Sequence, residues 1–233
     1  MKNEKELLGF YVSGHPLEPY KELVQAYGTP IRKIDEMEDG SPVRLAGMLA
    51  GFTKKFSKNS NKQFGIMSLE DFDSSCECMV YERALDAMTR DGIPTDPGTP
   101  LILEATVNRR DENERPRISV EKVYTLFEAP AKFTEEVYLH MYAQNVTPEQ
   151  QDQLAQLVKS SAGNTKLIIC LVREDDSVVF IESGTFIEPD YNFLSGVIRI
   201  LGRNSFKINA KPPRRPAPKR WKKPVDEAEP AQS

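Results

Sequence analysis

The stretch Val43–Phe52, with the sequence VRLAGMLAGF, decides the fold of this 233-residue chain. Before it, the segment from Glu18 to about Ala26 carries its apolar residues at helical spacing. Within the stretch, apolar and other residues alternate instead, which is typical of a β-strand. Gly47 and Gly51 lie inside it, and glycines inside a strand indicate a bend. The stretch therefore predicts one long, bent strand.

The segments that follow repeat the strand pattern, with one helical interruption. The order is three strands, a helix and two strands, which is the element order of an OB-fold, a five-stranded partly open barrel. The long bent first strand is what such a barrel needs to serve both of its sheets. The expected elements after the first strand are strands at Gln63–Leu69 and Cys76–Tyr81, a helix at Arg83–Arg90, and strands at Leu101–Arg109 and Arg117–Leu126.

A further region, from about Pro130 to Ile208, reads as a small α+β unit. Its clearest element is a helix over Pro148–Ser160, because Thr147 can cap it and Gln150 completes a capping box. The other expected elements are a strand around Val137–Met141, strands at Lys166–Arg173 and Ser177–Glu182, and a helix from about Asp190 to Leu201. The predicted domains are a helical lead-in (1–38), an OB-fold nucleic-acid-binding domain (40–128), a small α+β partner-binding domain (130–208) and a disordered tail (209–233).

Charge is distributed unevenly along the chain. The chain has 31 Lys and Arg against 35 Asp and Glu, a formal net charge of −4. The segment Lys207–Ser233 carries +5 from eight basic and three acidic residues, which leaves −9 for the rest. A basic arm attached to an acidic body is therefore expected. Arg214, Arg215 and the run Lys219–Lys223 around Trp221 either attract phosphates and stack on a base, or form a solubilising extension.

Compartment and membrane contact follow from the same composition. The longest aliphatic run, Leu167–Val172, is far shorter than the ~20 residues of a membrane-spanning helix. The charged start of the sequence has no apolar stretch behind it, so secretion is not expected. Three cysteines give no disulfide framework and are typical of a reducing cytoplasm. We expect a cytoplasmic, monomeric module without membrane contact.

The loop and strand from Thr53 to Leu69 are the most informative candidate site. This segment holds four lysines, no acidic residue and two phenylalanines. In OB-folds the loop joining the first two strands and the face of strands two and three bind oligonucleotides. Lysines neutralise phosphates, and aromatic rings stack on bases of any kind. The alternative is a solvated hairpin tip. The candidate nucleic-acid-binding residues are Lys54, Lys55, Phe56, Lys58, Lys62 and Phe64, with Arg109 and Arg110 closing the groove from the loop between strands four and five.

Other chemistry-bearing residues favour structural roles. Cys76 and Cys78 lie on one face of a strand, but a zinc site needs four ligands, so we expect two small apolar residues there. Glu70, Asp71 and Asp73 could bind a metal, although an acidic β-turn between strands two and three is the simpler interpretation. Neither of the two histidines lies near a nucleophile sequence, and no phosphate-binding glycine motif is present. No cofactor and no catalytic residue are expected in this chain.

A distinctive segment, Glu4–Leu17 with the sequence EKELLGFYVSGHPL, resembles the alpha subunit of bacterial DNA polymerase III, the replicative polymerase. In that family the segment ends the helical region after the fingers and leads into an OB-fold. Later stretches are also similar to the family's first three OB strands and the start of its helix. These stretches are Arg44–Gly47, Phe64–Asp71, Cys78–Tyr81 and the pair Ala84-Leu85.

The C-terminal unit is similar to the last domain of that subunit, through Gly184–Phe186 before Pro189. In the family this domain binds the tau subunit of the clamp loader. The resemblance does not extend to the basic tail.

The resemblance implies a non-catalytic C-terminal portion of a replicative polymerase. Its OB-fold would bind single-stranded template DNA, and its last domain would dock replisome proteins. The parent family is a DNA-directed DNA polymerase, a nucleotidyltransferase, but its palm, fingers, thumb and phosphoesterase-like domain are not in this sequence, so we expect the chain to be inactive alone. One alternative is a stand-alone OB-fold module that binds protein and not nucleic acid. Another is a hydrolase or nuclease that uses Glu70, Asp71 and Asp73.

Overall fold

The computed structural model describes residues 15–58, 60–109 and 115–214. The predicted helical segment around Leu7–Tyr11, the turn after Arg109 and the basic tail from Arg215 onward lie outside the described residues. Among the described residues, no helix combines the length and the apolar character needed to cross a membrane.

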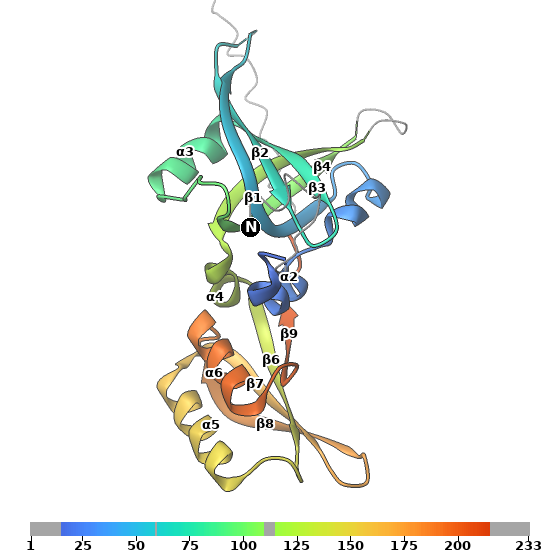
Figure 1. The fold of residues 1–233 in the computed structure, drawn as a ribbon, viewed down its shortest axis with the longest axis vertical. Coiled ribbons are helices and arrows are strands. Elements are labelled where there is room, and N and C mark those ends of the chain that lie inside the picture. The colour runs from blue at the N-terminus through green and yellow to red at the C-terminus, as the bar shows by residue number, and fades with distance from the viewer. Residues whose placement is uncertain (1–14, 59, 110–114, 215–233) are drawn as a thin grey trace, which may run out of the picture.

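The upper part of the molecule in Figure 1 is a closed five-stranded barrel with the strand order β1-β2-β3-β5-β4. All neighbouring pairs are antiparallel except β3 and β5, which are parallel. The helix α3 follows β3, as the OB-fold prediction requires, and the predicted fold is confirmed. The barrel elements are β1 (Pro42–Phe56), β2 (Gln63–Glu70), β3 (Ser75–Val80), α3 (Glu82–Arg90), β4 (Pro100–Asn108) and β5 (Arg117–Thr125).

The bend of β1 closes the barrel. Its first half pairs with β4 and its second half with β2, and the register shifts between Leu49 and Gly51. A Cβ added at Gly47 would collide with the carbonyl oxygen of Glu70, so this position requires glycine. Gly51 lies at the bulge with open space around it. The predicted bend is present, and Gly47 is the residue whose small size it depends on.

The lower part is a four-stranded sheet with the order β8-β7-β6-β9 (Figure 1). The capping box at Thr147 and Gln150 is present and begins α5 at Pro148, as predicted. The strand β9 was not predicted, and it contains Asn209 and Ala210, which the sequence assigned to the disordered tail. The elements are β6 (Thr134–Tyr142), α5 (Pro148–Ser160), β7 (Ala162–Val172), β8 (Val178–Ile187), α6 (Tyr191–Leu201) and β9 (Phe206–Ala210).

The correction at β9 has a physical reason. Phe206 and Ile208 are its only large apolar residues, so the alternation is too short to stand out beside the proline-rich segment that follows. Pairing with β6 orders it, because Phe206 lies opposite Leu139 and Ile208 opposite Val137. Tertiary pairing, rather than local pattern, makes this strand.

Short helices join the two parts. The helices α2 and α4 lie between the barrel and the second sheet (Figure 1). Their apolar residues share one core with both, in which Tyr27, Ala46, Phe133 and Phe193 are buried. The joining elements are the 3-10 turns η1 (Glu18–Tyr20) and η3 (Leu126–Glu128), with α2 (Lys21–Tyr27) and α4 (Ala129–Phe133). The 3-10 turn η2 (Ile31–Glu36) packs on the barrel core.

A buried arginine crosses this joint. Arg44 of β1 is 3% exposed; its guanidinium carbon lies 3.8 Å from the centre of the Phe133 ring, and the group donates to the Lys211 carbonyl oxygen at 3.0 Å. Burial lowers the pKa of Arg44, and the neighbouring Glu104 opposes that shift. Nearby, the hydroxyls of Tyr27 and Thr134 are 2.7 Å apart and both residues are buried. The barrel and the second sheet are therefore packed against a common polar and aromatic joint.

Candidate nucleic-acid interface

The hairpin of β1 and β2 has two faces with different side chains. Residues directly opposite in an antiparallel pair share a face, and successive residues alternate between faces. Lys55 lies opposite Phe64, and Ile66 lies opposite both Thr53 of β1 and Met79 of β3. We call Lys55, Phe64, Ile66 and Met79 the outer face, because the alternate residues of β2 and β3 point into the barrel core. This is the face of strands two and three on which OB-folds bind oligonucleotides.

The sequence-predicted residues Lys54 and Phe56 lie on the other side of the same hairpin. Lys54 pairs with Gly65, whose added Cβ would meet the half-buried Phe52 ring on the core side. Phe56 is 64% exposed and follows Lys54 on that side. The structure therefore separates Phe56 from Phe64, which the sequence had grouped as one stacking surface.

The two remaining hairpin lysines differ from each other. Lys58 is exposed in the loop, and no ion pair joins it to another described residue. The Lys62 Nζ lies 2.6 Å from the Glu82 Oε2 at the start of α3, and this hydrogen bond raises the pKa of Lys62. The charge of Lys62 is thus already paired. This ion pair could not be predicted from the sequence, because Glu82 is distant from Lys62 along the chain.

Arg109, directly after the end of β4, is hydrogen-bonded to residues in and after η2. Its backbone N–H donates to the Asp39 Oδ1 at 2.7 Å, and its guanidinium donates to the Asp35 carbonyl oxygen at 2.6 Å. Arg109 thus fastens the end of η2 and the segment after it to the barrel. Its predicted contact with nucleic acid stays a prediction. Arg110 is outside the described residues.

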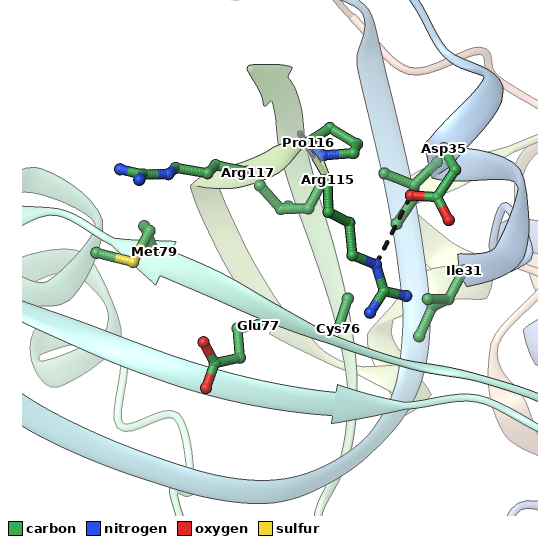
Figure 2. Close-up of a pocket in the computed structure, with 10 residues that line it drawn as sticks. Ile31, Asp35, Cys76, Glu77, Met79, Arg115, Pro116 and Arg117 are labelled. Carbon is green, nitrogen blue, oxygen red and sulfur yellow. Dashed lines mark ion pairs between the residues drawn. The ribbon is translucent and has the colours of Figure 1, made fainter. Parts of the chain in front are cut away.

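A pocket of about 490 Å³ lies beside the outer face, where β3 and β5 separate. The parallel ladder between these strands pairs only Cys78–Val80 with Ile118–Val120, and the pocket lies next to the unpaired residues that precede it. Figure 2 shows Arg115 reaching toward Asp35 across the pocket. This pocket was not predicted from the sequence. Its lining residues are Ile31, Ile34, Asp35, Cys76, Glu77, Met79, Arg115, Pro116, Arg117 and Ile118.

The carboxylate group next to this pocket is structural. Asp71 is 8% exposed and accepts the backbone N–H of Ile31 at 2.7 Å, of Asp73 at 3.0 Å and of Ser74 at 2.8 Å. These bonds form the β2–β3 turn and tie η2 to it, so the predicted acidic turn is confirmed. Among the described residues, no cluster of three His, Cys, Asp or Glu side chains is arranged to hold a metal ion.

The cysteine pair lies on the core side of β3. Cys78 is fully buried, and its Sγ lies 3.6 Å from the Sγ of Cys76, which is half-buried and lines the pocket. The hydrogen bond with Cys76 and burial raise the pKa of the Cys78 thiol. The predicted shared face is confirmed, with the addition that Cys76 reaches the pocket.

The second sheet has one face that no described helix covers. Helices α5 and α6 pack on the side of Val137, Leu139 and Leu167 (Figure 1). The strand pairing puts the alternate residues on the opposite side. There Phe180 is 66% exposed and Tyr142 is 51% exposed. We call this the open sheet face. Its exposed and half-buried apolar and aromatic residues are Tyr138, His140, Tyr142, Val172, Val178 and Phe180, and Ile168 and Cys170 of the same face are buried between their neighbours.

Comparison with known proteins gives one consistent result. The chain is 32% identical over 117 residues to DNA polymerase III subunit alpha of Helicobacter pylori, a match of 49% of this chain and 9% of that protein. It is 29% identical over 146 residues to the subunit of Aquifex aeolicus, covering 61% of this chain and 12% of that protein. The chain resembles DNA polymerase III subunit alpha.

The matches cover most of this chain at best, but only a small part of each relative. The subunit alpha of Pasteurella multocida matches 211 residues at 25% identity, which is 89% of this chain and 18% of that protein. The chain thus spans less than a fifth of the length of these DNA polymerase III subunits. The resemblance inferred from the sequence motifs is confirmed. No protein-family model matches the chain.

Among solved structures, a mitochondrial single-stranded DNA binding protein from S. cerevisiae is similar at 15% identity and a TM-score of 0.32. That match covers 37% of this chain and 95% of the other. The second OB-fold domain of replication protein A from Methanococcus maripaludis is similar at 13% identity and a TM-score of 0.31, over 42% of this chain and 93% of the other. The barrel assignment rests on the strand order and pairing given above.

Proposed function

We propose that the barrel binds single-stranded DNA as a non-catalytic part of a bacterial DNA polymerase III alpha subunit. The observation that carries the proposal is the placement of Lys55 and Phe64 side by side on the ligand-binding face of an OB barrel. The likeness to DNA polymerase III subunit alpha supports a role in DNA replication, which would be carried out in the cytoplasm.

The charge of the hairpin supports the same proposal, although the chain as a whole is acidic. The chain carries −4 overall, but Lys54, Lys55 and Lys58 are exposed and form no ion pair with another described residue. Phosphates compete well for such cations, because binding releases the counterions condensed on the nucleic acid. An acidic surface elsewhere would discourage non-specific adhesion, so binding would be confined to the hairpin and the outer face.

The test is the affinity of the full chain for a labelled single-stranded oligonucleotide, measured by fluorescence anisotropy at several salt concentrations. For single strands each phosphate contact adds about 0.7 to the slope of log K against log salt. Lys55→Ala is expected to reduce that slope by about this amount. Lys62→Ala is the matched control, with a smaller effect, because Glu82 already pairs with that lysine.

Two results would contradict the proposal. An affinity that does not depend on salt would show that the chain makes no phosphate contacts. An unchanged slope when Lys54, Lys55 and Lys58 are all replaced by alanine would show that the hairpin is not part of the binding site. Either result would favour the alternative, an OB barrel that binds protein.

We also propose that the second sheet docks a replisome protein through the open sheet face. The run Leu167–Val172 is apolar at successive positions, a pattern typical of strands buried on both faces. Helices cover one of these faces, and Phe180 and Tyr142 project from the other. Exposed aromatic residues of this kind are common in protein interfaces. By the resemblance to the polymerase subunit, the partner would be the tau subunit of the clamp loader.

The docking proposal is tested with purified tau subunit and the full chain in a surface-binding assay. Phe180→Ser and Tyr142→Ser should each weaken binding at least tenfold if they act as anchors, since anchors contribute about 2 kcal/mol or more. Phe56→Ser is the control, because Phe56 is 64% exposed and lies at the end of β1 in the barrel. Equal effects of all three variants, or no effect of any, would contradict the assigned face.

A further inference from the structure

We propose that the pocket between β3, β5 and η2 receives a single nucleobase of the bound strand and prefers a base that bears an amino group. The inference rests on the proposed single-strand binding by the barrel and adds to it a specific subsite. Four features of the pocket carry it: continuity with the outer face, an apolar floor, a rim with both charges, and a wall held at both ends by hydrogen bonds.

The outer face leads into the pocket. Phe64 and Ile66 alternate along β2, and Ile66 lies directly opposite Met79 of β3. Met79 is itself one of the residues that line the pocket. A strand that stacks on Phe64 and crosses the outer face therefore reaches the pocket without leaving the barrel surface.

The floor of the pocket suits the flat face of a base. Ile31, Ile34 and Ile118 contribute to the lining but are only 2%, 4% and 1% exposed, so they form a fixed backing, and the half-buried Cys76 and Met79 supply the apolar surface that a base can touch. Aromatic rings pack well on apolar and sulfur-bearing side chains. The volume of about 490 Å³ lies in the range of ~300–1,000 Å³ found for small-molecule sites. One base with its sugar therefore has room here.

The rim offers partners for both the base and the backbone. Figure 2 shows the carboxylates of Asp35 and Glu77 at the edge of the pocket, with Arg115 between its walls. Carboxylates accept hydrogen bonds from amino groups, as they do from the N4 amino group of cytosine. Arginines bind phosphate oxygens. Thymine has no amino group, so this rim favours cytosine, adenine and guanine over thymine.

The rim arginines are available for a ligand. The Arg115 Nε lies 3.7 Å from the Asp35 Oδ1, and the two side chains are 68% and 54% exposed. Exposed ion pairs of this kind add little to stability, so Arg115 can exchange Asp35 for a phosphate at small cost. Arg117 forms no ion pair with another described residue.

The wall formed by η2 is pre-organised. The buried carboxylate of Asp71 holds the backbone of Ile31 at one end, and Arg109 holds the Asp35 carbonyl at the other. Because both anchors are in place without ligand, little ordering is required on binding. This gives Arg109, expected from the sequence to touch DNA, a supporting part in the same site.

Cys76 provides a direct test, because it lines the pocket and is half-buried, whereas Cys78 and Cys170 are 0% and 1% exposed. The full chain is alkylated with iodoacetamide, alone and with saturating oligo(dC), and adducts are located by mass spectrometry. Binding is monitored in parallel by anisotropy. The Cys76→Ser variant gives the background labelling of the other thiols.

With oligo(dC) at about twenty times its Kd, Cys76 alkylation should slow at least tenfold, since the occupied fraction sets the protection. Inorganic tripolyphosphate at the same phosphate concentration should not protect. Protection by tripolyphosphate as strong as that by oligo(dC) would identify an anion site and overturn the assignment of a base.

Base preference supplies the second readout. The native chain should bind oligo(dC) about fivefold or more tighter than oligo(dT), the lower end of what one base contact contributes. Glu77→Gln should bring this ratio close to one. Asp73→Asn makes the same change of charge outside the pocket lining and should leave the ratio intact. An unchanged ratio in Glu77→Gln would contradict the proposal.

The outcomes separate this inference from the proposed function. If oligo(dC) binds with the expected salt dependence but Cys76 reacts at its free rate, the pocket stays empty and the inference alone is wrong. If no oligonucleotide binds, single-strand binding by the barrel is wrong, and the subsite is wrong with it.

Discussion

The barrel and the second sheet bury their strands in different ways. The barrel closes on itself, so every strand has two neighbours, and the alternate residues of β2 and β3 that are buried point inward. The second sheet is open, with β8 and β9 as edges, and helices cover only one of its faces. Outward residues of the barrel are not needed for its core, so they can contact a polar ligand. Exposed apolar residues of β8 on the open sheet face pack against nothing within the described chain, and we infer that a partner protein covers them.

The largest expected effect compares two phenylalanines of the second unit. Phe193 of α6 is fully buried under the covered face, and Phe180 is 66% exposed on the open sheet face. Phe193→Ala should lower the free energy of unfolding by about 3–5 kcal/mol, the usual cost of such a cavity. Phe180→Ala should change it by less than about 0.5 kcal/mol. Urea unfolding of both variants checks this, and similar losses would mean that the open face is covered within the chain.

The next effect concerns the turn that holds η2 against the barrel. Asp71→Ala removes the acceptor for three backbone N–H groups and should cost about 1–3 kcal/mol of stability. Asp73→Ala removes only an exposed ion pair with Arg32 at 3.5 Å and should cost less than about 1 kcal/mol. Thermal unfolding of the pair distinguishes them. A smaller loss of stability in Asp71→Ala than in Asp73→Ala would show that Asp71 does not hold η2 against the barrel.

The joint between the two parts should weaken at alkaline pH. Burial raises the pKa of Tyr124 to about 12, and burial raises the pKa of Tyr27 well above its usual value near 10. Below pH 10 both states hold these protons, so their contribution to stability is complete. Between about pH 10 and 12 the unfolded chain loses them first, and stability falls. Tyr124→Phe should show a smaller fall between pH 9 and 11.5 in urea unfolding, and an equal fall in the two proteins would contradict this assignment.

The smallest effect concerns the paired lysine of the hairpin. Glu82→Gln should release Lys62 and increase the salt slope of single-strand binding by up to about 0.7, one phosphate contact. Anisotropy titrations at several salt concentrations measure it. Arg83→Gln, one residue further along α3, changes charge in the opposite sense and should not increase the slope.

Much of the fold could be predicted because local signals agree with it. The capping box at Thr147 begins α5 at the predicted residue, and the alternation from Val43 marks β1. The strand β9 and the 3-10 turn η2 could not be predicted, because long-range pairing with β6 and the side chain of Asp71 hold them.

The candidate site was predicted by region but not by face. The sequence located the lysine-rich hairpin, yet the separation of Phe56 from Phe64 depends on the pairing register of β1 and β2, which the sequence leaves open. The pocket depends on where the β3–β5 ladder begins, and the engagement of Lys62 and Arg109 depends on residues far along the chain. The signal that could have found the outer face is the period of two that links Phe64 to Ile66.

The central claim is that single-stranded DNA binds the outer face of the barrel hairpin, and the two phenylalanines of that hairpin test it most directly. Phe64 lies on the outer face beside Lys55, and Phe56 lies on the opposite face. The measurement is the affinity of Phe64→Ala and Phe56→Ala for one labelled oligonucleotide at fixed salt. A lost stacking contact costs about 1–3 kcal/mol, so Phe64→Ala should bind roughly 5- to 150-fold more weakly, with Phe56→Ala close to native. A greater loss in Phe56→Ala, or equal losses in both variants, would contradict the account.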